Sequence, residues 1–162
     1  MTIRTLVAGL GTMGRSHALA YATNPAFELV GLVNRSKVDL PPDLAGVPLQ
    51  SDFYAALRGL TPDLACVATY TDSHADYACT AMEQGAHVFV EKPLAATVAE
   101  AQRVVDCAVA NGRKLVIGYI LRHHPSWMRL IAEARALGGP YVFRLNLNQQ
   151  SSGPTWEVHK TL

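Results

Sequence analysis

Two groups of residues in this chain have types and spacing suited to chemistry. The first is a turn with three glycines, Gly9, Gly11 and Gly14, which follows the apolar run Leu6–Ala8 and opens a helix-forming stretch that runs to Thr23. In such a turn the first glycine permits the tight bend, the second lets the backbone approach a phosphate, and the third lets the helix pack on the strand. Because N–H groups at a helix start attract anions, the turn predicts a site for the diphosphate of a dinucleotide, with Thr12 and Met13 beside it. An ordinary glycine-rich strand-to-helix loop has the same pattern and remains the alternative.

The second group is Glu91-Lys92-Pro93, which follows the apolar run Val88–Val90. Ligands bind outside the carboxyl ends of strands in open α/β sheets, so these side chains are well placed for a reaction. A lysine there can donate a hydrogen bond to a substrate hydroxyl or carbonyl, and it can relay a proton if its pKa is lowered. Taken alone, the same three residues also form an ordinary polar turn.

The residues Asn34, Arg35 and Ser36 lie where a dinucleotide site meets the adenosine ribose, about 20 residues past the glycine turn. An NAD site usually has Asp or Glu at this point, whereas residues 34–38 of this chain contain no carboxylate and the first one after them is Asp39. Asn34 and Ser36 can hydrogen-bond a ribose, and Arg35 offers a planar cation to a 2′-phosphate. We therefore expect NADP in preference to NAD, with a solvated basic turn as the alternative.

The elements that must position these residues alternate between strand and helix. Continuously apolar runs predict strands buried on both faces, and helical spacing separates most of them. This order predicts an α/β fold of Rossmann type, a doubly wound parallel sheet with right-handed crossovers. The link from Val38 to Val47 is too short for a full crossover helix, so we expect an irregular link, a short strand near residues 48–50 and a helix over 52–58. The predicted long strands are Leu6–Ala8, Leu29–Val33, Leu64–Ala68, Val88–Val90 and Leu115–Ile120.

Helix ends and the end of the chain give further expectations. Thr97 and Glu100 form a capping-box pattern, and Gly85 and Gly112 lie where helices end in a left-handed residue. The stretch Tyr141–Gln149 alternates apolar and polar residues, as in a sheet with one solvated face. We expect a dinucleotide-binding domain over residues 1–122 and the beginning of a truncated α+β C-terminal domain over 123–162, in which that strand lacks its partners.

Composition excludes several classes of protein. Of the 162 residues 49% are hydrophobic and the formal net charge is +1, so we expect neither disorder nor a nucleic-acid surface. No apolar run approaches the roughly 20 residues that cross a bilayer, and the start leaves no room for a signal peptide, so we expect a cytoplasmic protein. The three cysteines form no CxxC pattern, so we expect reduced thiols. The side chains of the neighbours His123 and His124 point in different directions on a helix or strand, so we expect no metal site.

Taken together, these motifs resemble the Gfo/Idh/MocA family of oxidoreductases. The resemblance implies an NADP- or NAD-dependent dehydrogenase or reductase that transfers a hydride to or from a sugar, cyclitol or similar polyol or carbonyl compound. It also implies that Lys92 contacts the reacting oxygen, that Glu91 helps to place it, and that the Lys92–Pro93 bond is cis. Thr71 and His74 match the family's segment after the fourth strand. Tyr119 and Arg122 match the part of the family pattern that lines the nicotinamide side of the cleft, with a strand-end tyrosine and a surface arginine as the alternative. The segments that carry the resemblance are the glycine turn, Thr71–His74, Ala86–Ala95, Gly118-Tyr119 and Arg122–Pro125.

Members of this family usually carry a further domain with the substrate pocket, the homo-oligomer interface and an Asp-x-Gly-x-His motif that holds the catalytic His. The 162 residues of this chain contain no such motif. We therefore expect little or no turnover from the chain itself. The first alternative is a noncatalytic nucleotide-binding or sensor protein of the same fold. A methyltransferase is another, but it explains neither Glu91-Lys92-Pro93 nor the missing acidic residue. His74 is equally well explained as a structural residue, and we assign Trp156, His159 and Lys160 to a loop.

Overall fold

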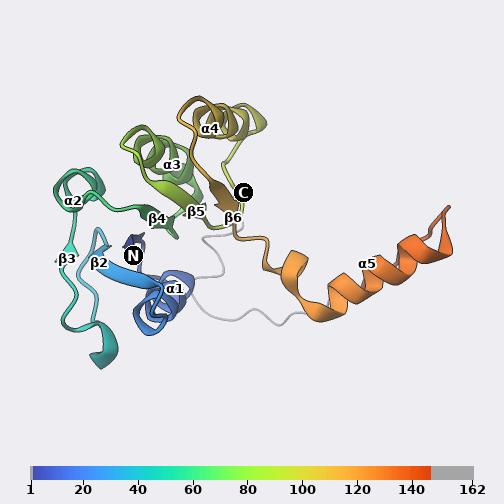
Figure 1. Cartoon of the computed structure of the whole chain (residues 1–162), viewed down its shortest axis with the longest axis horizontal. Helices are drawn as coiled ribbons and strands as arrows, with labels where there is room; N and C mark the ends of the chain where they lie inside the picture. The colour runs from blue at the N-terminus through green and yellow to red at the C-terminus, as the bar shows by residue number, and fades with distance from the viewer. Residues whose placement is uncertain (1, 147–162) are drawn as a thin grey trace. The chain divides into compact units, whose positions relative to one another are not determined.

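The computed structural model describes residues 2–146, and the chain forms two compact units, Met1–Gly118 and Tyr119–Leu162. A six-stranded sheet runs through the first unit in the order β3-β2-β1-β4-β5-β6, with every neighbouring pair parallel (Figure 1). This order is that of the doubly wound dinucleotide-binding fold, so the predicted fold class is confirmed. The strands are β1 (Ile3–Ala8), β2 (Phe27–Val33), β3 (Leu49–Gln50), β4 (Leu64–Val67), β5 (His87–Val90) and β6 (Leu115–Ile117).

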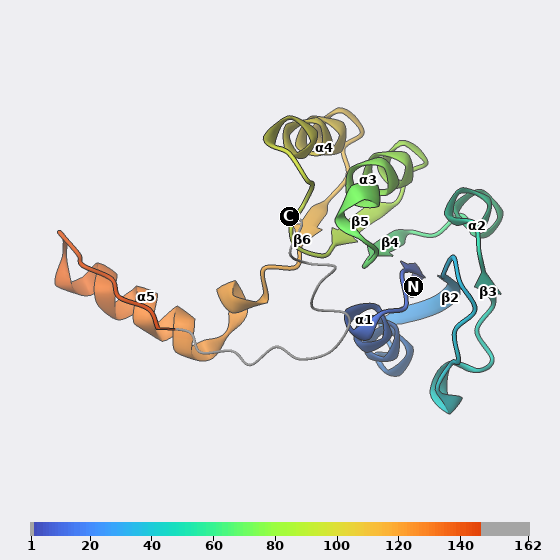
Figure 2. The ribbon, with the colours of Figure 1, turned by 180° about the vertical axis from the view of Figure 1, so that it is seen from behind.

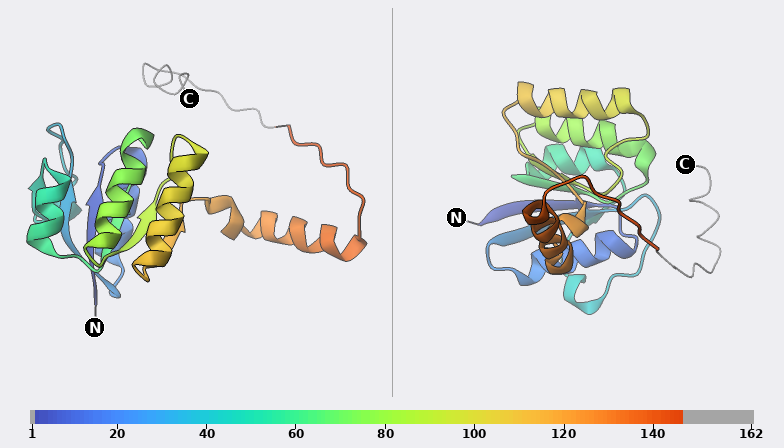
Figure 3. Two further views of the ribbon diagram at one scale, coloured as in Figure 1. Left: turned by 90° about the horizontal axis from the view of Figure 1, so that it is seen from above. Right: turned by 90° about the vertical axis from the view of Figure 1, so that its right-hand side faces the viewer.

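Helices cover the sheet of the first unit from both sides. Helix α1 (Thr12–Thr23) lies on one face, and α2 (Phe53–Leu60), α3 (His74–Glu83) and α4 (Val98–Ala110) lie together on the other (Figures 2 and 3). Side chains alternate across a strand, and β1 divides accordingly. Leu6 and Ala8 belong to the core under α2, α3 and α4, whereas Val7 belongs to the core under α1. Burial on both faces explains why the strands appear in the sequence as unbroken apolar runs.

The predicted helix ends are confirmed. The Thr97 hydroxyl accepts a hydrogen bond from the Glu100 amide at 3.2 Å, and the Glu100 carboxylate accepts one from the Thr97 amide at 3.1 Å. Gly85 and Gly112 have φ of +94° and +61°, the left-handed region that glycine adopts without strain. The link after β2 is irregular, as expected, and holds only the short 3₁₀ helix η1 (Pro42–Leu44), whose Leu44 is fully buried.

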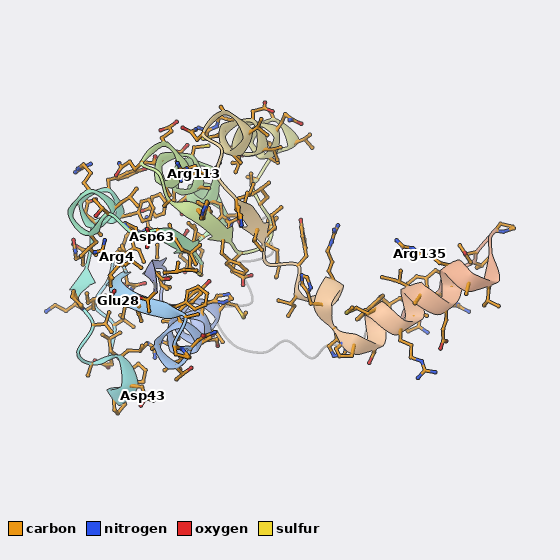
Figure 4. The ribbon with its side chains drawn as sticks, viewed as in Figure 1. Arg4, Glu28, Asp43, Asp63, Arg113 and Arg135 are labelled. Atoms are coloured by element: carbon orange, nitrogen blue, oxygen red, sulfur yellow. The ribbon has the colours of Figure 1, made fainter. Side chains whose placement is uncertain are left out.

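Arg4 joins the amino end of β1 to the segment that leads into β4. The Arg4 amide donates to the Asp63 carboxylate at 2.9 Å, and the Arg4 guanidinium donates to the carbonyl of Thr61 at 2.9 Å (Figure 4). These bonds tie the start of β1 to the chain that enters β4. The polar residues singled out from the sequence lie at the other, carboxyl edge, so the Arg4 contacts are structural.

The described part of the second unit contains the 3₁₀ helix η3 (Ile120–His123) and the helix α5 (Pro125–Leu137). After α5, the Tyr141 hydroxyl donates to the carbonyl of Ala134 at 2.6 Å. Two sequence predictions are corrected here. The predicted strand Tyr141–Gln149 is wrong for residues 141–146, which form no strand, and residues 147–149 lie outside the described residues. Alternation favours a strand only where a neighbouring strand completes the ladder, and none follows α5 in the described part of the chain.

The strand expected over Leu115–Ile120 is also shorter in the structure, where β6 ends at Ile117. Gly118 follows with its backbone against the Glu91 carboxylate, and η3 begins at Ile120. Within residues 2–146, no helix combines the length and apolar content that a membrane span requires.

Candidate functional site

The glycine turn joins β1 to α1 at the carboxyl edge of the sheet. Gly9 has φ of +88°, and a Cβ there would overlap the carbonyl oxygen of Ala68. A Cβ at Gly14 would overlap the carbonyl oxygen of Gly9, so α1 can lie this close to the turn only with glycine at that position. These two glycines are therefore required by the fold itself.

Gly11 differs from the other two glycines. It is the N-cap of α1 with φ of −68° and ψ of −170°, a conformation that any residue adopts, and a Cβ there would have nothing within 4 Å. No side chain in the described residues caps α1, so the N–H groups of its first turn, including those of Thr12 and Met13, have no such partner. The space over Gly11 and the positive end of the helix dipole together favour an anion.

Asn34 links the end of β2 to the glycine turn. Its side-chain oxygen accepts a hydrogen bond from the Leu10 amide at 2.9 Å, and its amide nitrogen donates to the carbonyl of Ser36 at 2.9 Å. Asn34 thus fixes both the turn and the loop that carries Arg35 and Ser36, whose side chains are exposed.

Arg35 lies within electrostatic range of Tyr77 on α3. Burial raises the pKa of the Tyr77 phenol, and the positive charge of Arg35 opposes this rise.

Glu91, Lys92 and Pro93 follow β5 at the same edge, and the Lys92–Pro93 bond is cis, as expected. Lys92 and Pro93 are exposed, whereas Glu91 is only 6% exposed. The Glu91 carboxylate contacts Nε2 of His17 at 2.7 Å and accepts a hydrogen bond from the Lys92 amide at 3.2 Å. A buried carboxylate needs such partners because it has lost its water.

His74 is the first residue of α3, and its side chain is 1% exposed. Its Nδ1 lies 2.8 Å from the carbonyl oxygen of Pro93, and its Nε2 lies 3.1 Å from the carbonyl oxygen of Thr69. Both ring nitrogens face carbonyl oxygens, and a neutral imidazole, which carries one N–H, donates to one of them. Of the two roles considered for His74, this geometry favours the structural one, because the ring is buried between the loops that follow β4 and β5.

The thiol of Cys66 on β4 lies beneath this region. Burial, and after it the negative charge of Glu91, raise the pKa of Cys66 to about 12. The thiol is therefore neutral at ordinary pH and acts as a packed apolar group. In residues 2–146 no group of three or more His, Cys, Asp or Glu side chains is arranged to hold a metal ion.

The structure brings most of the predicted site residues to one edge of the first unit, at the ends of β1, β2, β4 and β5. Thr71 lies in η2 (Thr71–Ser73) after β4, directly before His74. Arg122 and Tyr119 belong to the second unit, where the guanidinium carbon lies 6.0 Å from the centre of the tyrosine ring. Their predicted place beside a nicotinamide stays a prediction.

Two residues that sequence reasoning missed belong to this edge. The Arg15 guanidinium donates to the carbonyl of Leu10 at 3.1 Å and so closes the glycine turn. His17 pairs with Glu91, as described. The signal for His17 was its position three residues after Gly14, which puts both on the side of α1 that faces the sheet.

Comparison with known proteins agrees with this geometry. Residues 3–119 match the Gfo/Idh/MocA family, described as an oxidoreductase family with an NAD-binding Rossmann fold. An inositol 2-dehydrogenase of Salmonella typhimurium is 25% identical over 170 aligned residues, covering 100% of this chain and 51% of that protein. An inositol 2-dehydrogenase of Acidiphilium cryptum is 34% identical over 141 residues, covering 82% of this chain and 41% of that protein. The chain thus spans about half the length of the curated relatives it matches.

Solved structures give the same result. UDP-N-acetylglucosamine 3-dehydrogenase from Acidithiobacillus ferrooxidans is 29% identical with a TM-score of 0.71, over 82% of this chain and 44% of that one. The scyllo-inositol dehydrogenase from Lactobacillus casei, solved with NAD(H) and scyllo-inositol, shares the fold at 22% identity with a TM-score of 0.73, over 83% of this chain and 42% of that one. The strand order, the glycine turn and the match over residues 3–119 establish that this chain belongs to the Gfo/Idh/MocA family of oxidoreductases.

Proposed function

We propose that the first unit binds a nicotinamide dinucleotide along the carboxyl edge of its sheet. The observation that carries the proposal is the open backbone at Gly11 beside the uncapped start of α1. The diphosphate lies there, against the amides of Gly11, Thr12 and Met13. The adenosine ribose lies toward Asn34 and Ser36 at the end of β2, and the nicotinamide lies toward Thr71 and Lys92.

The reaction we propose is hydride transfer at a carbinol carbon, for which a bound nicotinamide supplies the hydride acceptor or donor. In the oxidation direction the carbon–hydrogen bond breaks with its electron pair, and the hydroxyl proton must leave at the same time. Lys92 contacts that oxygen and, in its uncharged amine form, takes the proton to become the ammonium; in the reduction direction the ammonium returns the proton. Glu91 fixes the backbone from which this lysine extends.

The choice between NADP and NAD is the finer part of the proposal. The exposed Arg35 and the absence of a carboxylate at residues 34–38 support NADP, because a guanidinium binds a 2′-phosphate through paired hydrogen bonds. The description of the family as NAD-binding supports NAD. Dissociation constants for NADPH and NADH decide between them, and a clear preference for NADH refutes the NADP assignment.

For the substrate we propose a cyclitol or related polyol, since the relatives that cover most of this chain are inositol 2-dehydrogenases. Substrate binding, homo-oligomer formation and a cytoplasmic location are proposals for the whole protein. So is the assignment of residues 123–162 to the start of a C-terminal domain. They remain proposals because this chain spans only about half the length of the relatives on which they rest.

Lys92→Ala in the full-length protein tests the proposed function. We expect turnover of myo-inositol with NAD⁺ or NADP⁺ to be abolished, and the dissociation constant for the reduced dinucleotide to change less than about threefold. Loss of turnover with binding retained separates a catalytic lysine from a damaged fold. Unchanged turnover refutes the role of Lys92, and a wild-type protein that binds the dinucleotide without turning over any polyol favours the noncatalytic sensor.

A further inference from the structure

The carboxylate of Glu91 is held on several sides at once. His17 on α1 contacts Oε1 at 2.7 Å, and the Lys92 amide donates to Oε2 at 3.2 Å. On another side lies Gly118, where an added Cβ would come within 3.0 to 3.1 Å of three carboxylate atoms. The His17 ring, the Lys92 amide and the Gly118 backbone, which belong to α1, to the loop after β5 and to the residue after β6, therefore lie close around the carboxylate.

His17 is the side chain that holds this buried carboxylate from outside its own loop. The two side chains are 18% and 9% exposed, so little water competes for the contact. The His17 ring is itself oriented by Phe89 on β5, with ring centres 4.8 Å apart and the planes at 60°. An edge-to-face contact of this kind fixes the ring plane and points Nε2 at the carboxylate.

The position of His17 on α1 relates this contact to the glycine turn. Helix α1 begins at the turn that we assign to the diphosphate, and His17 lies one helical turn after Gly14. One rigid element therefore presents N–H groups at its start and a histidine to Glu91 further along. Because the Lys92 amide is bonded to the same carboxylate, the backbone at Lys92 is fixed relative to α1.

We propose that His17 is a positioning residue for Lys92: by holding Glu91 it sets the distance between the phosphate-binding helix and the reactive amine. The inference rests on the proposed role of Lys92. Catalytic groups must be held closely, and misplacement by about 1 Å can lower a rate about a hundredfold. Loss of the His17 contact leaves the Glu91 carboxylate free to turn and the Lys92 loop free to shift.

The test compares His17→Ala with His17→Gln and His87→Ala in the full-length protein, using myo-inositol and the preferred dinucleotide. His87→Ala is the matched control, because its Nδ1 accepts a hydrogen bond from the Lys114 amide at 3.0 Å at the opposite end of β5. We expect His17→Ala to lower kcat about ten- to hundredfold, with less than a threefold change in the dinucleotide dissociation constant. His17→Gln, which keeps an N–H donor, restores kcat to within about fivefold of wild type, and His87→Ala changes kcat less than twofold.

Hydrogen exchange at the Lys92 amide gives a second reading that needs no substrate. We expect exchange there to quicken at least fivefold in His17→Ala and to stay within twofold of wild type in His87→Ala. If His17→Ala does not fold, Glu91→Gln replaces it, since it keeps the side-chain size and weakens the same pair, and it lowers kcat about tenfold. Wild-type kcat and wild-type Lys92 exchange in the folded variant overturn the inference, whereas an active Lys92→Ala protein overturns the proposed function instead.

Discussion

The three glycines of the turn have different tasks, and two alanine substitutions separate them. In Gly14→Ala the new methyl group overlaps the Gly9 carbonyl oxygen, a backbone atom that the turn holds in place. Overpacking of this kind lowers the unfolding free energy by up to about 3 kcal/mol, and the better helix propensity of alanine offsets about 1 kcal/mol of that loss. The expected net loss of unfolding free energy is about 2 kcal/mol, or a fall in Tm of about 4–8 °C for a chain of this size.

In Gly11→Ala the new methyl group has nothing within 4 Å. The poorer N-cap and the stiffer unfolded chain nearly cancel, so the unfolding free energy changes by about 0.5 kcal/mol or less. The methyl group instead keeps the diphosphate away from the amides, and hydrogen bonds to a charged group contribute about 1.5–3 kcal/mol. The dissociation constant for the dinucleotide therefore rises about ten- to hundredfold.

Both variants are measured by urea unfolding and by calorimetric titration with NADH and NADPH on the 162-residue chain. The expected pattern is a stable Gly11→Ala protein that binds weakly and a destabilised Gly14→Ala protein. A Gly11→Ala protein with wild-type affinity refutes the placement of the diphosphate. A Gly14→Ala protein as stable as wild type refutes the close approach of α1 to the turn.

Three further predictions concern single residues of the first unit. His74→Ala removes the contacts to the Pro93 and Thr69 carbonyls and lowers the unfolding free energy by about 1–3 kcal/mol in urea; an unchanged midpoint contradicts the structural role. Arg35→Ala raises the dissociation constant for NADPH about tenfold and leaves that for NADH unchanged; equal effects on both exclude a contact to the 2′-phosphate. Burial raises the pKa of Cys66 from 9.0 in the unfolded chain to about 12 in the folded protein, so between these pH values the folded protein retains a proton that the unfolded chain has lost. The part of the unfolding free energy that depends on this proton is therefore fully present below pH 9 and is lost between pH 9 and 12. Alkaline unfolding curves of wild type and Cys66→Ala measure it, and identical slopes contradict it.

The sequence predicts the fold correctly wherever the local pattern of apolar residues matches the burial of those residues in the structure. The apolar runs around Val7 and Val88 are strands because both faces of the sheet are covered, and Thr97 caps its helix through a residue three positions away. The strand expected from Tyr141 was wrong over its described residues, because alternation does not specify a partner strand. A strand is stabilised by its neighbour, which is not a local property of the sequence.

The candidate site was predictable in its residue types but not in its contacts. The glycine spacing and the sequence around Lys92 identify groups that suit a diphosphate and a reacting oxygen. Nothing local indicates that His74 lies against the carbonyl of Pro93, or that His17 meets Glu91 from another element. These pairs form only when the crossovers bring the carboxyl ends of the parallel strands to one edge.

The proposed binding of the dinucleotide along the carboxyl edge of the sheet is best tested by a crystal structure of the protein with its preferred dinucleotide. We expect diphosphate oxygens about 3 Å from the amides of Gly11 and Met13, with the nicotinamide ring on the side of Lys92 and the adenosine beside Asn34. A dinucleotide bound away from the glycine turn, or bound in reverse with its adenine beside Lys92, would refute this placement.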